Sequence, residues 1–551
     1  MKELSLIQLY EQAIKNHFKS PALSDYGTDD TYTFGDVALE IKKLHILFDE
    51  LKIRQGDKIG LIGKNNAKWC ITYLATITYG AITVPILQDF VPDDVLHIVN
   101  HSDSILLFSS DSIYETLDYN RMTNIKAVIS LSNFQVLQQQ ENEKVDVILS
   151  DISRKFTDRY PNGFQQEDVR FPNLSDDNIM VLNYTSGTAG FTKGVMITGG
   201  SLSNNLIFAC ETLPLKTTDR ILSFLPLAHT YGCAFEFLFP FLEGVHITLL
   251  NRIPSPKILI KAFQEVKPLL IISVPLILEK VYKNMIQPTI NKKGIKLALK
   301  IPGLNYIIYN IIRRKLAAAF GSNFTNVIIG GAPLNSEVES FMVKINFPVT
   351  VGYGMTECAP LISFSIAEDY IPLSSGKVLP NMRVRIDSPD PEIVAGEIQV
   401  KGPNVMKGYY KNEEATQEAF TDDGWLKTYD LGTMDKNQNI FIRGRSKSMI
   451  LSANGQNIYP EEIEARLNNM PYIAESLVVN RKGKLVALIC PDREAMKASG
   501  LKEADLENIM TENKENLNKN VAYYERIAEI QLQTEEFEKT PKKSIRRFLY
   551  N

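Results

Sequence analysis

Short apolar segments that alternate with helical segments constrain this chain more than any other feature of its sequence. Lys58 to Gly63 is predicted to form a strand, and Lys68 to Thr78 a helix that ends at Gly80. Leu269 to Pro275 and Asn326 to Gly331 are predicted strands, each ending in a turn signal. This alternation indicates layered α/β structure with largely parallel sheets. Ligands of such sheets lie beyond the carboxyl ends of the strands, so functional residues are expected there.

The character of the sequence changes after about residue 445, and a second domain is predicted from that point. A predicted helix, Pro460 to Met470, precedes a β-rich segment, Ser476 to Pro491. A very polar tract, Leu501 to Gln533, follows and is predicted to be helical. These segments indicate a smaller C-terminal domain of mixed α and β structure. The full length of 551 residues allows roughly three or four compact units.

Charge and cysteine content exclude several classes of protein. The formal net charge is −4, from 60 basic and 64 acidic residues, which argues against a dedicated nucleic-acid binder. The five cysteines are scattered, as expected for a reducing cytosol. The N-terminus begins with an amphipathic pattern and not with an apolar signal core, so the chain is expected to be cytoplasmic. Glu236 and Glu243 interrupt the most apolar stretch, which is too short to span a bilayer.

A glycine- and threonine-rich segment, residues 183–194, follows the apolar strand predicted at 179–182. Its glycines allow several backbone N–H groups to converge on an anion. Its hydroxyls and one lysine supply further donors and charge, as a polyphosphate requires. The segment is not a Walker loop, because Thr192 precedes Lys193 and Gly194 follows it. The alternative interpretation is a flexible surface turn.

Two acidic segments make the phosphate interpretation stronger. Val351 to Glu357 also follows a strand, and its carboxylate suits a magnesium ion beside a phosphate loop. Lys427 to Gly432 places Asp430 in a predicted turn, where an aspartate can accept hydrogen bonds from both ribose hydroxyls. Taken singly, either acid is more often a surface or capping residue.

These segments, in this order and at these separations, resemble the adenylate-forming superfamily of acyl-CoA synthetases, adenylation domains and firefly-type luciferases. The resemblance covers nearly the whole chain. The matching segments, after the phosphate loop, are Leu225–His229, Gly330–Pro333, Tyr353–Glu357, Asp430, Gly444–Ile450, Asn454–Glu464 and a terminal lysine.

The resemblance implies a fold, a domain boundary and a set of site residues. The fold would be α/β: a large N-terminal domain, 1–446, of layered sheets plus a β-barrel-like subdomain, and a small mobile α+β domain, 447–551. Lys447 would be the hinge, and Gly455 would line a channel for coenzyme A. Thr185 and Glu357 would hold Mg²⁺, and Asp430 and Arg445 the ribose. The remaining ATP-binding residues would be Ser186, Gly187, Thr188, Lys193, Gly331, Ala332, Tyr353, Gly354 and Thr356.

The terminal lysine lies in a segment that departs from the family pattern. Relatives commonly end in Pro-x-Gly-Lys-Ile-x-Arg, whereas residues 540–547 are TPKKSIRR, with no glycine and one residue fewer. Counting three residues back from Arg546 selects Lys543 as the catalytic lysine, and Lys542 is the competitor. A basic extension for anionic partners is the other interpretation.

The acid is indicated by a second, narrower resemblance. The stretch from Glu279 to Leu334 resembles the long-chain fatty acyl-CoA synthetase branch, with a longer insert at Ile286 to Asn310. That insert is apolar and basic, which suits a membrane surface or an ordinary amphipathic helix pair. His229 would lie near the carboxylate or in the acyl pocket, or be a core histidine. One bacterial subgroup carries a gating tryptophan where this chain has Cys233.

Together these features predict an ATP-dependent ligase that adenylates a carboxylic acid, a medium- or long-chain fatty acid, and transfers the acyl group to coenzyme A. ATP, Mg²⁺ and coenzyme A are the expected cofactors, with no nucleic acid and with peripheral contact to the inner face of a membrane. The alternatives are an acyl-AMP ligase that loads a carrier protein and a non-catalytic lipid- or nucleotide-binding relative.

Overall fold

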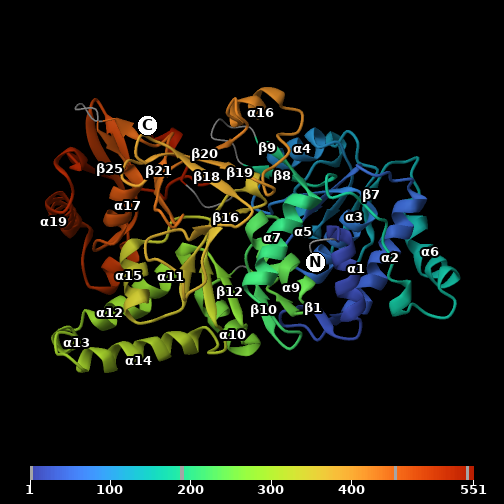
Figure 1. The fold of residues 1–551 in the computed structure, drawn as a ribbon, viewed down its shortest axis with the longest axis horizontal. Helices are drawn as coiled ribbons and strands as arrows, with labels where there is room; N and C mark the ends of the chain where they lie inside the picture. The colour runs from blue at the N-terminus through green and yellow to red at the C-terminus, as the bar shows by residue number, and fades with distance from the viewer. Residues whose placement is uncertain (1–3, 186–191, 253, 452–455, 541–544, 551) are drawn as a thin grey trace.

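The structure, a computed structural model, describes residues 4–185, 192–252, 254–451, 456–540 and 545–550. In Figure 1 the N-terminal half lies on the right and the C-terminal part on the left. The main chain forms mixed α/β layers followed by a smaller C-terminal unit, as the sequence predicts. Among the described residues, no helix combines the length and apolar character needed to cross a bilayer.

The largest sheet has seven strands, and its inner strands are parallel. In spatial order they are β7 (Val136–Gln139), β6 (Ala127–Ser130), β5 (Ser104–Ser109), β3 (Lys58–Ile62), β4 (Ile82–Ile86), β8 (Ile179–Thr185) and β9 (Lys193–Thr198). Only the edge strands β7 and β9 pair antiparallel to their neighbours. Strands buried on both faces carry continuous Ile, Leu and Val runs, which is why the sequence predicted them.

Two smaller sheets continue the layers. One contains β10 (Arg220–Ser223), β11 (His246–Leu249), β1 (Pro21–Asp25) and β2 (Thr31–Thr33). The other is wholly parallel and contains β12 (Leu270–Ser273), β13 (Asn326–Ile329) and β14 (Val349–Val351). The N–H of Leu269 donates to the carbonyl of Arg220 at 3.0 Å. This bond places the strand β12 beside β10.

The barrel-like part of the prediction corresponds to two antiparallel sheets. The first contains β15 (Tyr353–Gly354), β16 (Leu361–Phe364) and β17 (Lys377–Val378); the second contains β18 (Arg383–Asp387), β19 (Gly396–Lys401), β20 (Leu426–Met434) and β21 (Ile440–Arg445). An antiparallel bridge between Lys377 and Asn439 joins them. The predicted turn at Lys427 to Gly432 is wrong, because this segment lies inside β20. Tyr429 has a φ of 59°, so the strand is locally irregular next to Asp430.

Helices cover the sheets. The longer ones are α1 (Leu6–Asn16), α2 (Phe34–Glu50), α3 (Ala67–Tyr79), α4 (Pro92–His101), α6 (Val145–Arg159), α7 (Gly199–Thr212), α10 (Pro256–Val266), α14 (Leu304–Ala319), α15 (Ser336–Lys344), α17 (Pro460–Asn468) and α19 (Leu506–Lys519). Shorter ones are α5 (Asp111–Tyr114), α8 (Thr230–Gly232), α9 (Phe239–Leu242), α11 (Pro275–Val281), α12 (Gln287–Ile290), α13 (Lys293–Ala298), α16 (Glu413–Ala419) and α18 (Arg493–Ala498). Helix α3 ends at Gly80, whose φ of 99° is left-handed, as predicted.

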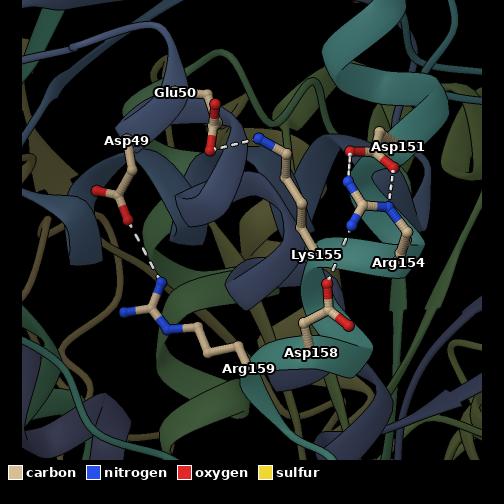
Figure 2. Close-up of polar contacts among 7 residues, drawn as sticks. All are labelled: Asp49, Glu50, Asp151, Arg154, Lys155, Asp158 and Arg159. Carbon is tan, nitrogen blue, oxygen red and sulfur yellow. Dashed lines mark hydrogen bonds and ion pairs between the residues drawn. The ribbon is translucent and has the colours of Figure 1, made fainter.

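Exposed ion pairs tie α6 to α2 at the edge of the large sheet (Figure 2). Lys155 Nζ lies 2.6 Å from Glu50 Oε1, and Arg159 Nη1 lies 3.4 Å from Asp49 Oδ2. A third cation, Arg154, bonds within α6 to Asp151 and Asp158. Such exposed pairs each contribute well under about 1 kcal/mol. The apolar residues beneath them therefore supply most of the packing energy.

The C-terminal unit is a three-stranded sheet of β24 (Ile473–Arg481), β25 (Lys484–Pro491) and β26 (Glu529–Leu532), preceded by the small pair β22 (Ile450–Leu451) and β23 (Asn457–Ile458). The predicted helix at 460–470 and the β-rich segment are confirmed. The prediction that Leu501 to Gln533 is helical throughout is wrong. Helix α19 ends at Lys519, and β26 then pairs parallel to β25. This partner is distant in sequence, so local polarity could not reveal it.

The hydrophobic cores divide where the sequence changes. Buried apolar residues through Ile440 form one cluster, and those from Ile458 onward form two separate clusters on the faces of the C-terminal sheet. Independent cores are what distinguishes domains. The predicted boundary at Lys447 lies in this interval, and its exact position stays a prediction.

Candidate active site

The predicted segments gather at the carboxyl ends of several parallel strands. Residues 225–229 follow β10, Gly330 and Gly331 follow β13, and Tyr353 follows β14. The N–H of Gly352 donates to the carbonyl of Ile329 at 2.9 Å, so the last two segments leave the sheet side by side. This edge is where α/β sheets bind their ligands.

The described ends of the candidate phosphate segment belong to β8 and β9, which pair antiparallel. Thr185 pairs with Lys193 and Tyr184 with Gly194; Ser186, Gly187 and Thr188 lie outside the described residues. The ammonium of Lys193 lies 4.8 Å from the ring centroid of Tyr409. Oγ1 of Thr192 is buried and has no hydrogen-bond partner among the described residues. A buried hydroxyl of this kind suits an acceptor such as a phosphate oxygen.

Glu357 lies in a short helical turn, Thr356–Cys358, after β15. Its Oε1 accepts a 2.9 Å hydrogen bond from the hydroxyl of Tyr409. Tyr409 thus lies between the carboxylate and Lys193 of β9. Among the described residues, no three His, Cys, Asp or Glu side chains cluster as a metal cage. One carboxylate and one threonine hydroxyl nevertheless fit Mg²⁺, which usually takes few protein oxygens and completes its shell with phosphates and water.

Asp430 is the buried centre of the candidate ribose site. Tyr353 donates its hydroxyl to Oδ2 at 2.8 Å, and Arg445 Nε lies 3.1 Å from Oδ1. Burial raises the pKa of Asp430, while Arg445 and Tyr353 act in the opposite direction. The carboxylate of Asp430 raises the pKa of Arg445. Glu357 also acts on both pKa values, so the candidate metal and ribose residues share one electrostatic environment.

Two glycines of the site are required by geometry. A Cβ on Gly354 would lie 2.0 Å from the carbonyl oxygen of Pro360, and Gly331 has a φ of 84°. Thr356 is buried, whereas Ala332 is exposed beside Gly331. Gly354 thus allows its backbone to pack directly on that of Pro360, and Gly331 allows the left-handed turn after β13.

The segment 225–229 is held by three buried polar residues that sequence reasoning did not assign to the site. Glu236 Oε2 accepts hydrogen bonds from the N–H groups of Phe224 at 3.0 Å and Leu225 at 2.9 Å. Asn65 donates to the carbonyl of Leu225 and accepts from the N–H of Leu227; Asn183 donates to the carbonyl of Ala228. One signal was available, because Glu236 is an acid inside an apolar run.

His229 at the end of this segment is half-buried. Its Nδ1 accepts a hydrogen bond from the N–H of Tyr231 at 3.4 Å and caps α8. Tyr231 in turn donates to the carbonyl of Ile328 at 3.1 Å, and its ring packs on Gly330. His229 is therefore tied to the edge that carries the glycine segment.

A small apolar void lies beneath the same segment. Its lining includes Asn183, Thr230, Cys233, Ala234 and Leu202. Cys233 is buried, and burial raises the pKa of its thiol to about 12. The thiol is therefore protonated at neutral pH and behaves as a small apolar group. The void is too small for an acyl chain, and it marks an apolar region next to Thr230, the residue that follows His229.

The predicted hinge lies just after β21, beside the ribose residues. Ser446 donates its N–H to the carbonyl of Tyr429 at 2.9 Å, and Lys447 Nζ lies 5.3 Å from the ring centroid of Tyr429. Gly455 lies outside the described residues. Polar contacts join the C-terminal unit to the larger one, among them Lys283 to the carbonyl of Ile473 at 2.9 Å and Asn335 to the carbonyl of Ala465 at 3.1 Å. Such an interface is compatible with domain motion.

The described residues on either side of the terminal lysines form a hairpin. Lys539 and Ile545 pair as an antiparallel bridge; Lys542 and Lys543 lie outside the described residues. Arg546 makes a partly exposed ion pair with Glu538 at 3.1 Å. Arg547 instead binds the buried carboxylate of Glu464 on α17. Arg547 is thus the arginine that anchors the end of the chain.

Comparison with family models matches two regions of this sequence. Residues 9–410 match the model described as AMP-binding enzyme, and residues 447–550 match the model described as AMP-binding enzyme C-terminal domain. The first match contains the phosphate segment, His229 and Glu357, and the second begins at Lys447.

Curated relatives align over most of the chain. A long-chain-fatty-acid–CoA ligase, FadD15 of Mycobacterium bovis, is 29% identical over 491 residues, covering 84% of this chain and 78% of the relative. The long-chain-fatty-acid–CoA ligase ACSBG2 of Rattus norvegicus is 24% identical over 556 residues, covering 92% and 80%. A putative acyl-CoA synthetase of Bacillus subtilis, YngI, is 27% identical and covers 78% and 76%.

Solved structures share the fold. The anthranilate CoA ligase AuaEII in complex with anthranoyl-AMP superposes with a TM-score of 0.78 at 18% identity, covering 99% of this chain and 96% of that one. The o-succinylbenzoate coenzyme A synthetase of Bacillus subtilis with ATP and magnesium gives a TM-score of 0.73 at 22% identity, covering 98% of each chain. At these identities the likeness establishes the two-domain α/β architecture.

Proposed function

This chain belongs to the AMP-binding enzyme family, and from that premise we propose that it is an AMP-forming acid–thiol ligase. It adenylates a medium- or long-chain fatty acid with ATP and transfers the acyl group to coenzyme A. AMP and pyrophosphate are the other products. The names of the curated relatives support the fatty acid and coenzyme A.

The observation that carries the proposal is the arrangement around Asp430. Its carboxylate is held by Tyr353 on one side and Arg445 on the other. Glu357 acts electrostatically on Asp430 and bonds to Tyr409, which packs on Lys193. This order, from the carboxylate of Asp430 past Glu357 to the ammonium of Lys193, suits a nucleotide with its ribose at Asp430 and its phosphates toward Lys193.

The first half-reaction is an in-line displacement at the α-phosphorus. The fatty acid carboxylate attacks the α-phosphorus, the bond to the β-phosphate oxygen breaks, and pyrophosphate leaves. Fixed donors and positive charge lower the barrier, because charge builds up on the phosphoryl oxygens. Mg²⁺, when bound, neutralises the leaving group, and Thr185 and Glu357 would hold it. Lys543 would meet the α-phosphate and the attacking carboxylate.

Before the second half-reaction, the terminal lysine must leave the site and the thiol of coenzyme A must enter it. The thiolate of coenzyme A attacks the acyl carbon, and AMP leaves. We assign the exchange to a rotation of residues 447–551 about Lys447, since hinges are a few loop residues that absorb a large backbone change. Gly455 would then enter the site and allow the pantetheine arm to pass close to the backbone.

We assign the acyl chain to the direction of the void beside Cys233. His229 would lie at the carboxylate end, and the apolar residues around Ala234 would contact the methylene groups. Each buried methylene group is worth about 0.8 kcal/mol, so the apolar side chains along this direction would set the preferred chain length.

The proposed location is the cytoplasm, at the inner face of a membrane. All five cysteines are free and buried, as suits a reducing compartment. Long-chain acids partition into bilayers, so an enzyme that uses them gains from peripheral contact.

A pyrophosphate-release screen tests the proposal. Purified protein is given ATP, Mg²⁺ and one acid from a fatty, aryl or amino-acid set, with and without coenzyme A. We expect release with fatty acids and acyl-CoA formation only when coenzyme A is present. Transfer to a carrier protein but not to coenzyme A would contradict the assigned acceptor. Absence of acid-dependent release would contradict a catalytic role altogether.

A further inference from the structure

The segment from residue 280 to 336 differs in charge from the rest of the chain. It contains nine basic residues and no aspartate or glutamate, although the whole chain has a net charge of −4. The basic residues are Lys280, Lys283, Lys292, Lys293, Lys296, Lys300, Arg313, Arg314 and Lys315. A long segment in which every charged residue is basic is typical of a surface for an anionic partner.

The same segment exposes large apolar side chains. Leu297 on α13 is 66% exposed, Ile307 on α14 is 54% exposed and Tyr306 is 72% exposed. Ile301 on the connection between the helices, and Leu304 and Ile311 on α14, are also exposed. Exposed apolar side chains concentrated in one segment in this way are typical of an interaction site in soluble proteins.

Helix α14 carries two apolar faces. Ile312, Leu316 and Ala319 are buried against the core. Leu304, Ile307 and Ile311 recur at intervals of three and four residues and form another face, which stays exposed. An ordinary amphipathic helix needs only the first face. The exposed face is therefore unexplained by folding.

Basic side chains flank the exposed apolar face. Lys292, Lys293, Lys296 and Lys300 are exposed before it, and Arg314 and Lys315 are exposed one turn after Ile311. Within the described parts of the chain, none of these six forms an ion pair with a carboxylate. In Figure 1, α13 and α14 lie along one edge of the molecule.

We propose that residues 292–315, the α13–α14 surface, dock on an anionic phospholipid bilayer. Apolar side chains would enter the boundary between head groups and acyl chains, and the lysines would pair with lipid phosphates. The inference rests on the proposed function, since the bilayer would supply the fatty acid. Helix α14 leads through Phe320 into β13, whose carboxyl end carries Gly330 and Gly331 of the site. Docking at α14 is thus structurally continuous with the active site.

Charge argues against a second copy of this chain as the occupant. A two-fold contact would bring the same surface of each copy together, and the lysines of one copy would face the lysines of the other. Like charges in that position oppose association. An acidic carrier protein is the other candidate occupant, and the test includes it.

Vesicle sedimentation tests the surface. The full chain is mixed with vesicles of phosphatidylcholine alone or of phosphatidylcholine with one-quarter phosphatidylglycerol. We expect binding to the anionic vesicles, weaker binding to the neutral ones, and a decline with added salt. The variant K292E/K296E/K300E should bind anionic vesicles at least about tenfold more weakly. I307S/I311S should also bind more weakly, with little change in salt dependence.

Matched controls lie in other parts of the fold. K482E/K484E/K497E reverses three exposed lysines of the C-terminal unit, and Ile393→Ser removes an apolar residue that is 79% exposed. Both should bind vesicles as the parent chain does. Thermal unfolding and acyl-CoA synthesis from dissolved octanoate establish that each variant is folded.

The outcomes separate the surface from the proposed function. Ligase activity on octanoate without vesicle binding would overturn the surface and leave the function intact. Vesicle binding that requires Lys292, Lys296 and Lys300, in a protein without ligase activity, would support the surface and overturn the proposed function. Binding that the α13–α14 variants do not weaken would overturn the surface. The surface would also be overturned if the chain formed a dimer that I307S/I311S dissociates. The same holds if the α13–α14 variants lost only acyl transfer to an acidic carrier protein.

Discussion

The hydroxyl of Tyr353 donates a 2.8 Å hydrogen bond to Oδ2 of Asp430, and the two residues belong to different antiparallel sheets. The bond stabilises the ionised carboxylate against its burial. Together with Arg445, Tyr353 thus favours the ionised form of the residue proposed to bind the ribose.

Tyr353→Phe should therefore weaken ATP binding and shift its pH dependence. Removing the donor raises the pKa of Asp430, which burial already raises. The acidic limb of kcat/KM for ATP should move to higher pH, because more of the carboxylate is protonated at a given pH. We expect a loss of about tenfold to a hundredfold at pH 7, in line with one hydrogen bond to a charged group. A steady-state pH profile measures it.

Tyr370→Phe is the control for that experiment, since Tyr370 also donates to a buried carboxylate, Glu339, but away from the nucleotide residues. Its profile for ATP should match that of the parent. An unchanged acidic limb in Tyr353→Phe would contradict the role assigned to the bond.

Glu236 provides a stability prediction with a definite pH dependence. Burial raises the pKa of Glu236 well above its usual value, so the folded protein holds this proton more tightly than the unfolded chain. Stability contributed by the protonated form is present at low pH and decreases as pH rises above the unfolded pKa toward the folded one. Glu236→Gln cannot ionise. The free energy of unfolding of Glu236→Gln minus that of the parent should therefore be larger at pH 8 than at pH 5.

Glu236→Ala gives the complementary result. It leaves the N–H groups of Phe224 and Leu225 without their acceptor, at a cost of about 3 kcal/mol. Urea unfolding at several pH values measures all three proteins. Parallel pH dependence in the parent and Glu236→Gln would show that Glu236 does not titrate as assigned.

The side chain at position 233 is expected to influence the preferred length of the acyl chain. Cys233→Met adds volume at the void, so it should lower kcat/KM for palmitate more than for octanoate, by about tenfold in their ratio. Cys210→Met is the control, because Cys210 is also buried but does not line the void. A similar change of ratio in both variants would indicate general destabilisation and not a role in chain length.

Much of this architecture could be predicted from local patterns. The apolar strands, the helix that ends at Gly80 and the order of the motifs each depend on neighbouring residues, and the structure confirms the α/β fold they indicated. The failures have a common physical cause. Asp430 was placed in a turn from its local segment alone, whereas its strand is fixed by pairing with Arg445, 15 residues later. Strand β26 depends on β25 in the same way.

The candidate site shows the same division. Glu357 and Asp430 were found because short motifs surround them. Asn65 and Glu236 have no motif of their own. Their backbone partners lie within residues 224–227, which for Asn65 are about 160 positions away in the sequence. Only the folded chain reveals that these two residues shape the segment leading to His229.

The end of the chain provides the prediction that depends most on the structure. Counting back from Arg546 selects Lys543, but Arg547 is the arginine bound to the buried Glu464. Counting three residues back from Arg547, with Ile545 in the isoleucine position of the motif, selects Ser544 instead. The lysine nearest to that position is Lys543, which keeps it the proposed catalytic residue.

Lys543→Ala should therefore reduce acid-dependent pyrophosphate release by at least about a hundredfold, because a fixed charge at the transferring phosphoryl group is lost. Thioester formation from supplied acyl-adenylate should be nearly unchanged, since that step no longer needs the lysine. Lys542→Ala is the matched control and should affect neither step strongly. A selective defect in Lys542→Ala would shift the assignment by one residue. Equal loss of both steps in Lys543→Ala would contradict a role confined to adenylation. If Ser544→Lys restored adenylation in the Lys543→Ala background, the catalytic position would be the one counted back from Arg547.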